Sequence, residues 1–188
     1  MLERADRLRT RTLISILALL AGVLTSAPAA WAAGCAGAHA AAVKGRSADL
    51  ARAVVCEINR VRARHGLHRV RTNRDIQQAA RGHTVEMVRR NYFSHVSPSG
   101  TTPADRLRRS GYLRRNTAWH VGETLAWGTG PRSTPAAIVR AWIHSTGHRH
   151  ILLMPDFRSV GVGASAGLPV TGQRYPGGTY TADFGVRH

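Results

Sequence analysis

Residues 91–98 read NYFSHVSP and residues 121–127 read VGETLAW, and the interpretation of the chain starts from these two stretches. In the first, two aromatic residues anchor the segment and a proline-containing turn places His95. In the second, Glu123 is the one carboxylate on an otherwise apolar strand. Because a buried acid needs a partner, we expect Glu123, with a histidine nearby, either to form an ion pair or to bind a metal.

A third chemical group follows further along the chain, in Gly147-His148-Arg149. His144 and His148 have the four-residue spacing of a helical metal-binding pair. Gly147 lies between them, however, and is predicted to end the helix, which would break their shared face. The sequence therefore places His148 at a helix end rather than on a helical pair with His144.

Four helices are predicted around these motifs, because apolar residues recur at helical spacing on one face of each segment. The second segment begins with the capping-box pattern TNRD, and the third and fourth begin with Thr-Pro, with proline at the first helical position. The predicted helices span residues 47–65, 72–90, 102–111 and 134–147.

Three strands are predicted, at residues 121–127, 160–166 and 179–184. The glycine-rich residues 167–178 are expected to connect the last two strands as a hairpin. Helices come mostly first and strands later, which favours an α+β fold over a doubly wound α/β fold.

The composition indicates one globular domain with a strong positive charge. The chain has 188 residues and 43% hydrophobic residues, which excludes disorder throughout. Its net charge is +17, and 26 of its 27 basic residues are Arg. GC-rich coding favours Arg over Lys, whereas an anionic partner would give the charge a function. Both readings remain open.

The N-terminal 32 residues are predicted to be a secretory signal peptide. Four Arg precede a run at residues 13–24 that is too short for a membrane span, which needs roughly 18 residues. An A-x-A cleavage pattern follows at residues 30–32. We therefore expect a signal peptide at 1–32, a strap at 33–46, a domain at 47–188, and no transmembrane segment in the mature chain. An uncleaved N-terminal anchor is the alternative.

Two cysteines are too few for a disulfide framework or a four-cysteine zinc site. After export to an oxidising compartment, they are expected to form a Cys35–Cys56 disulfide. Closing a loop of about 20 residues stabilises the fold by roughly 3 kcal/mol in the chain-entropy model, and would pin the strap to the first helix. Alternatively, Cys35 is lipidated and anchors a membrane lipoprotein, leaving Cys56 unpaired.

Five motifs that occur in order carry a family resemblance. They resemble the bacterial branch of the CAP superfamily (cysteine-rich secretory proteins, antigen 5 and pathogenesis-related 1), also called SCP domains. The resemblance covers residues 49–186 and implies an α-β-α sandwich, with a small, mainly antiparallel sheet between helical layers. The motifs are NYFSHVSPSGTTPADRLRRSGY (91–112), VGETLAWG (121–128), AWIHSTGHRHIL (141–152), FRSVGVGAS (157–165) and YTADFG (180–185).

The resemblance also implies a cleft that holds a divalent metal in some members of the superfamily. His95 matches its first histidine, Glu123 the glutamate of its G-E-N-like motif, and His148 its second histidine. These three residues would suit Zn²⁺ with an open fourth position. The alternative is a metal-free network in which Glu123 accepts from one histidine and orients the other.

The sequence departs from the superfamily pattern at three positions near this cleft. Thr124 stands where many members have Asn, and His150 stands where bacterial relatives usually have Asn. Ser145 stands where plant and animal members carry a second Glu. Ser145 removes a negative charge that would help to hold a cation, so it favours the metal-free alternative.

Two functional classes fit these observations. The first is a secreted module that binds a lipid, glycan or protein at the cell surface. The second is a protease- or esterase-like hydrolase that uses the same cleft. Ser94 and Ser145 adjoin the histidines only in sequence, which does not make a catalytic dyad, so no catalytic residue is assigned and a binding role is favoured.

The mature chain would keep 23 basic and 8 acidic residues, a charge of +15. This charge favours association with anionic cell-wall polymers or lipid head groups. A specific nucleic-acid partner is not expected, because export separates the chain from nucleic acid.

Export gives the first testable prediction. N-terminal sequencing of the protein recovered from the culture medium should begin at Ala33 or Gly34, because cleavage is expected after the A-x-A pattern. Recovery of the full-length chain from the cytoplasm would contradict the signal-peptide prediction, and a diacylglycerol on Cys35 would replace it with the lipoprotein alternative.

Overall fold

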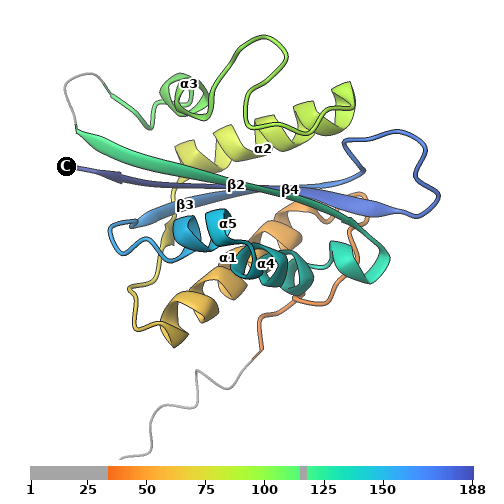
Figure 1. Cartoon of the computed structure of the whole chain (residues 1–188), viewed down its shortest axis with the longest axis horizontal. Helices are drawn as coiled ribbons and strands as arrows, with labels where there is room; N and C mark the ends of the chain where they lie inside the picture. Colours follow the sequence, from red (N-terminus) through yellow and green to blue (C-terminus); the bar gives the residue numbers. More distant parts are fainter. Residues whose placement is uncertain (1–33, 115–117) are drawn as a thin grey trace, which may run out of the picture. The chain divides into compact units, whose positions relative to one another are not determined.

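A four-stranded sheet lies between two helical layers in the computed structural model, which describes residues 34–114 and 118–188 (Figure 1). The strand order is β1-β3-β4-β2; β1 pairs with β3 in parallel, and the other pairs are antiparallel. The strands are β1 (Arg71–Thr72), β2 (Trp119–Thr129), β3 (Ser159–Ala166) and β4 (Gly177–Arg187). The α-β-α sandwich with a mainly antiparallel sheet is confirmed, while the signal peptide at 1–32 lies outside the described residues.

Helices cover both faces of this sheet. Figure 1 shows α2 and α3 on one side and α1, α4 and α5 on the other. In the part of the chain that is described, no helix is long and apolar enough to cross a bilayer. The helices are α1 (Ser47–Arg64), α2 (Arg74–Arg90), α3 (Pro103–Arg109), the short 3₁₀ helix η2 (Gly130–Ser133), α4 (Pro135–His144) and α5 (Thr146–Leu152).

The sequence prediction was wrong about where the fourth helix ends. Helix α4 stops at His144, because Ser145 takes an extended backbone conformation with φ −97° and ψ 124°. Gly147 then lies inside the short helix α5 and ends nothing. His148 is therefore within a helix rather than at the end of one, and the two histidines four residues apart belong to different helices.

The start of α2 also differs from its prediction. Asn73 alone caps the helix, and its side-chain oxygen accepts from the backbone N–H groups of Asp75 and Ile76. Thr72 belongs to β1, so the expected capping box does not form there. At α3, by contrast, Thr102 and Asp105 form a reciprocal capping box.

The larger apolar core lies between the sheet and the layer that contains α1 and α4. Trp142, Tyr180, Phe157 and Phe184 are almost fully buried in it. The polar ends of two of these aromatic residues are satisfied: the Trp142 indole donates to the Leu125 carbonyl at 3.0 Å, and the Tyr180 hydroxyl donates to a carbonyl of η2 at 2.6 Å. This face supplies most of the hydrophobic stabilisation.

The opposite face of the sheet carries a smaller apolar cluster, and it has small and polar residues where α2 crosses β3. A Cβ atom on Gly163 would lie 2.3 Å from the Ala80 carbonyl oxygen of α2, and a Cβ on Gly161 would lie 2.2 Å from the Gln77 nitrogen. The backbone of α2 therefore packs directly onto β3. Thr84 of α2 donates to the hydroxyl of Thr181, on the neighbouring strand β4, at 2.8 Å. Polar side chains can thus be buried between α2 and the sheet.

The predicted Cys35–Cys56 disulfide is present, with the two Cα atoms 5.7 Å apart. It joins the strap to α1, and the Ala38 carbonyl accepts a hydrogen bond from Ala136 N at 2.8 Å, which ties the strap to α4 as well. The strap is thus part of the folded domain.

The close packing of α2 on β3 gives a stability prediction. Gly163→Ala should lower the free energy of unfolding by about 1–3 kcal/mol, because the new methyl group overlaps the α2 backbone. Gly82→Ala is the matched control: it lies inside α2, its Cβ would meet nothing within 4 Å, and Ala should stabilise the helix by about 0.5–1 kcal/mol. Urea titration compares the two variants, and equal stabilities would contradict the packing argument.

Candidate functional site

The candidate site is organised around Glu123, whose side chain is only 2% exposed. Its Oε1 accepts a hydrogen bond from His95 Nδ1 at 2.7 Å, and its Oε2 accepts one from Arg106 Nη2 at 2.7 Å. The buried acid thus has two partners: it forms an ion pair with Arg106 and a hydrogen bond with His95. Arg106 was not anticipated.

Arg106 holds the loop that carries His95 as well as the carboxylate. Its guanidinium donates to the His95 carbonyl at 2.9 Å and to the Thr101 carbonyl at 3.2 Å. Arg106 is itself 6% exposed and projects from α3, whose first turn is fixed by its capping box. One side chain therefore connects α3, β2 and the loop between α2 and α3.

A second set of contacts fixes the other end of this loop. His83, buried on α2, donates from Nε2 to the Ser94 carbonyl at 3.0 Å. The Ser97 hydroxyl donates to Glu86 Oε2 at 2.8 Å, and the Tyr92 hydroxyl donates to Ser97 Oγ at 3.2 Å. The loop is thus held on both sides of His95, which limits the positions its imidazole can take.

The His95 ring faces solvent on its other edge. Its side chain is 51% exposed, although Nδ1 is bound to Glu123. Because Nδ1 donates to the carboxylate, the neutral ring carries its lone pair on Nε2, the nitrogen turned away from Glu123. Phe93 and Val96 of the same loop are 42% and 44% exposed. The surface around His95 therefore combines an oriented imidazole with apolar side chains.

His148 lies half-buried on α5, near enough to His95 for their charges to interact. Burial lowers the pKa of the His148 imidazole first, and a positive charge on His95 lowers it further. Ser145, also predicted in the cleft, forms the junction between α4 and α5, and its side chain caps neither helix. In the described residues, the contacts link Glu123 with His95 directly and His148 with His95 electrostatically.

The side chains as they lie do not fit the three-ligand zinc site. Both Glu123 oxygens are engaged, one by His95 and one by the Arg106 cation. Within residues 34–114 and 118–188, no group of three or more His, Cys, Asp or Glu side chains is placed to hold a metal ion. Metal binding stays a prediction, and no chemical step is derived from it.

A second buried acid, Asp183, stands opposite Glu123 on the adjacent strand β4. Its side chain is fully buried, and neither carboxylate oxygen accepts a hydrogen bond from a donor of the described residues. Burial raises the pKa of Asp183 well above its usual range, and the neighbouring Glu123 charge raises it further. Burial and the Glu123 charge therefore favour the protonated form of Asp183, which can donate to Glu123.

The Glu123 pKa moves the other way. Burial alone would raise it, but the hydrogen bond from His95 and the positive charge of Arg106 outweigh burial and bring it below the ordinary value. The pKa values of the two acids that face each other across the strands are therefore shifted in opposite directions, which favours the charge on Glu123 and the proton on Asp183.

Sequence reasoning missed both Arg106 and Asp183. Arg106 is one of 26 arginines, and nothing in its local pattern distinguishes it from the others. Asp183 had a usable signal, because it is the one acid in the apolar strand motif YTADFG, just as Glu123 is in VGETLAW.

Comparison with known proteins identifies a family and several relatives of this chain. The family model for the cysteine-rich secretory protein family, CAP, matches residues 55–170, more than half of the chain. YkwD, an uncharacterized protein of Bacillus subtilis (strain 168), is 33% identical over 105 residues, and YlbC, an uncharacterized membrane protein of the same organism, is 36% identical over 107. Each alignment covers 56% of this chain, but only 38% of YkwD and 28% of YlbC.

Two solved structures have the same fold. An extracellular protein of Bacillus anthracis that contains an SCP domain superposes with a TM-score of 0.59 at 30% identity, over 73% of this chain and 40% of that protein. An outer surface protein of Borrelia burgdorferi gives a TM-score of 0.58 at 19% identity, over 72% of this chain and 90% of that protein. The second likeness concerns the fold alone.

The raised pKa of Asp183 gives a prediction for how the stability of the fold depends on pH. Because its pKa is higher in the folded state than in the unfolded state, the unfolded chain releases a proton above about pH 4 that the folded chain retains. Wild type should therefore lose stability relative to Asp183→Asn as the pH rises above about 4, with a slope of up to about 1.4 kcal/mol per pH unit. Denaturant titration at each pH measures this difference.

Asp156→Asn is the control for this series, because Asp156 is exposed. Its stability should run parallel to that of wild type across the same pH range. The Glu123 contribution is present above about pH 4.5 in wild type and in Asp156→Asn alike, so it cancels from their comparison. Parallel curves for Asp183→Asn and wild type would mean that Asp183 is ionised in the fold.

Proposed function

The chain belongs to the cysteine-rich secretory protein (CAP) family, and we propose that it is an extracellular ligand-binding domain whose binding surface is centred on His95, Glu123 and His148. The extracellular part of this proposal is supported by the SCP-domain protein of Bacillus anthracis, described as extracellular, and by the predicted signal peptide. The chain spans well under half of that protein and of the Bacillus subtilis relatives, so the proposal concerns this domain.

The observation that carries the binding proposal is the fixed orientation of a solvent-facing imidazole. His95 is half-exposed, yet its ring is bound to a buried carboxylate at 2.7 Å and its carbonyl to a buried guanidinium at 2.9 Å. Holding a group in its bound position before the ligand arrives reduces the entropy lost on binding. A histidine with only a structural role would have no need of the open Nε2 edge.

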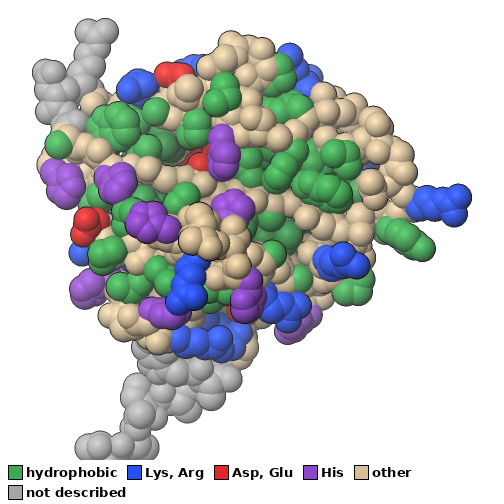
Figure 2. Space-filling model, viewed as in Figure 1, with side chains coloured by type: hydrophobic (Ala, Val, Ile, Leu, Met, Phe, Trp, Pro, Cys, Tyr) green, Lys and Arg blue, Asp and Glu red, His purple; other side chains and the backbone are tan. Residues whose placement is uncertain are grey.

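The surroundings of His95 favour a ligand with both polar and apolar parts. Phe93 and Val96 expose apolar surface on the same loop. Figure 2 shows histidine side chains gathered on one face of the molecule, with hydrophobic side chains between them. Imidazoles supply hydrogen bonds, and the apolar side chains supply contact area, a combination that suits a lipid, a glycan or a protein surface.

Hydrolysis at the same site is the alternative, since an imidazole oriented by a carboxylate can act as a general base. The geometry of the two serines disfavours it. The Ser94 hydroxyl accepts a hydrogen bond from Val96 N at 3.2 Å, and the Ser145 hydroxyl caps neither adjoining helix. Neither serine hydroxyl is hydrogen-bonded to an imidazole in the described part of the chain, so binding is the favoured function.

The test compares wild type with His95→Gln on lipid vesicles, wall-glycan fragments and immobilised surface-protein extracts. Loss of one imidazole contact should weaken binding to the preferred class about tenfold, the equivalent of a hydrogen bond of about 1.4 kcal/mol. His65→Gln, at an exposed position at the end of α1, is the matched control and should stay within about twofold of wild type.

Two results would contradict the proposal. Equal binding by wild type and His95→Gln would place the ligand elsewhere. Turnover of ester or peptide substrates that is abolished by Ser94→Ala or Ser145→Ala would establish the hydrolase instead.

A further inference from the structure

A row of exposed arginines runs along the edge of the molecule formed by β1 and α2. None of these guanidinium groups forms a salt bridge in the described residues, and all five side chains are exposed. The row consists of Arg69, Arg71, Arg74, Arg81 and Arg89.

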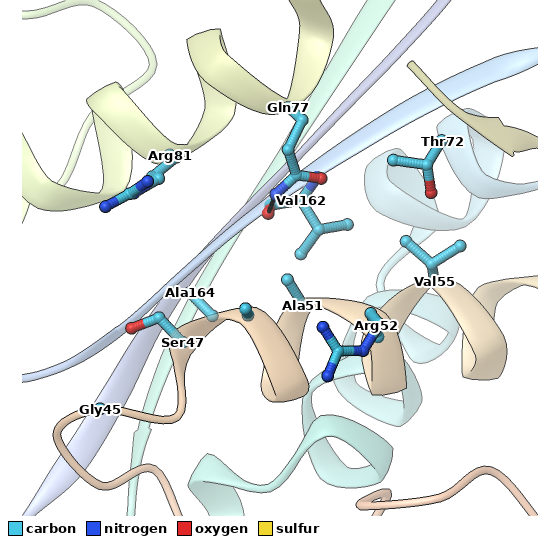
Figure 3. Close-up of a pocket in the computed structure, with 11 residues that line it drawn as sticks. Gly45, Ser47, Ala51, Arg52, Val55, Thr72, Gln77, Arg81, Val162 and Ala164 are labelled. Carbon is cyan, nitrogen blue, oxygen red and sulfur yellow. Dashed lines mark hydrogen bonds between the residues drawn. The ribbon is translucent and has the colours of Figure 1, made fainter. Parts of the chain in front are cut away.

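Three hollows along this edge share lining residues and form one continuous trough. The first, of about 570 Å³, lies between α1 and α2 above β3, and Figure 3 shows Val162, Ala164 and Ala51 between the two helices. The second, of about 790 Å³, shares Val55 and Thr72 with the first. The third, of about 680 Å³, runs along α2.

The arginines line this trough from end to end. Arg69 and Arg71 line the second hollow, Arg81 lines both the first and the third, and Arg74 and Arg89 line the third. Along α2, the fifteen-residue interval from Arg74 to Arg89 corresponds to about 22 Å at 1.5 Å per residue. The positive groups are thus spread along a line rather than gathered at one point.

The trough exists because β1 is only two residues long. It pairs with Ser159 and Val160 of β3, which leaves the rest of that edge without a neighbouring strand. The Gln77 side chain hydrogen-bonds both the N–H and the carbonyl of Val162, as a strand would (Figure 3). Because these groups are satisfied internally, side chains rather than an added strand would hold an occupant here.

The acids near the trough do not neutralise it. Asp49 binds Arg46 and Arg52, so Arg52, which also lines the first hollow, is already paired. Asp75 lies on α2 beside Arg74, but it lines none of the three hollows and forms no ion pair with a trough arginine in the described residues. The unpaired charge in the trough is therefore positive throughout.

We propose that this trough binds a linear, phosphate-bearing polymer of the cell envelope, laid along β1 and α2. Guanidinium groups bind phosphate oxygens bidentately, and a row of them matches charges that repeat along a chain. A recess between two helices admits a single chain, whereas a flat lipid surface would meet only its rim. The proposal rests on the proposed extracellular role but not on the His95 site, since no trough-lining residue is hydrogen-bonded to His95 or Glu123.

The test uses inorganic polyphosphate as the probe and two triple variants of the full domain. The trough variant carries Arg71→Gln, Arg74→Gln and Arg81→Gln. The control carries Arg132→Gln, Arg140→Gln and Arg174→Gln, three exposed arginines outside the trough, and has the same net charge. Fluorescence anisotropy at several salt concentrations gives the affinity and its salt dependence for each.

The trough variant should lose about 2 from the slope of log affinity against log salt, at about 0.7 per contact for a single-stranded polyanion. With affinities equal at about 1 M salt, this difference amounts to roughly 100-fold at about 0.1 M. The control should lose less than about fivefold. Both variants should keep the wild-type melting temperature, since exposed substitutions change stability little.

Several outcomes would overturn the proposal. Equal losses in the two triple variants would show a general charge effect. Orthophosphate that competes as well as the polymer at equal phosphate concentration would show a point site. Vesicles rich in phosphatidylglycerol that compete better than polyphosphate would make a membrane the partner.

His95→Gln separates this proposal from the proposed function. It should bind polyphosphate as wild type does, even if it loses binding to the lipid, glycan and protein panel. Loss of polyphosphate binding in His95→Gln would show that the two sites are one, and would overturn the proposal that the trough binds independently. Loss of panel binding alone would leave the trough standing.

Discussion

The ion pair between Glu123 and Arg106 is the interaction on which the candidate site depends. Both side chains are almost fully buried, and their atoms meet at 2.7 Å. Removing one partner of a buried pair commonly costs about 3–5 kcal/mol, because the other charge is left without compensation. Here the loss would reach further, since the same guanidinium holds two carbonyls of the loop that carries His95. Strand, helix and loop are positioned by one group.

Glycine at two positions of β3 makes room for this polar interior. With no Cβ atoms at Gly161 and Gly163, α2 lies directly on the sheet, and His83 on α2 comes close enough for Glu123 and Arg106 to affect its pKa. Burial lowers the pKa of His83, which suits its role as a neutral hydrogen-bond donor to Ser94. The opposite face carries the aromatic core. The face of the sheet toward α1 and α4 thus carries the larger apolar core, and the face toward α2 holds charged groups in fixed positions.

The sequence could predict the features that local pattern encodes. The α+β class, the sandwich architecture, the disulfide, and a partner for Glu123 all followed from periodicity, spacing, family resemblance and the cost of a buried acid. The identity of that partner did not follow, because any of 26 arginines could supply the guanidinium and only the tertiary fold selects Arg106. The end of α4 at Ser145 was not predicted for a related reason. Glycine is a common residue at helix ends, whereas the sequence around Ser145 gives no sign that its backbone is extended.

Composition explains the number of arginines but not which of them lack an acidic partner. GC-rich coding accounts for arginine in place of lysine, but not for which arginines lack a partner. Of the eight acids after residue 32, five pair with arginines in the described structure, and Asp183 is buried with its pKa raised by burial. Four of those five pair with arginines three or four residues away on the same helix or at its start, as local sequence dictates. In the described residues no acid forms an ion pair with the five arginines of the β1–α2 edge, although Asp75 lies beside Arg74, so the charge of this edge remains available to an anionic partner. The five paired acids are Asp49, Glu57, Glu86, Asp105 and Glu123.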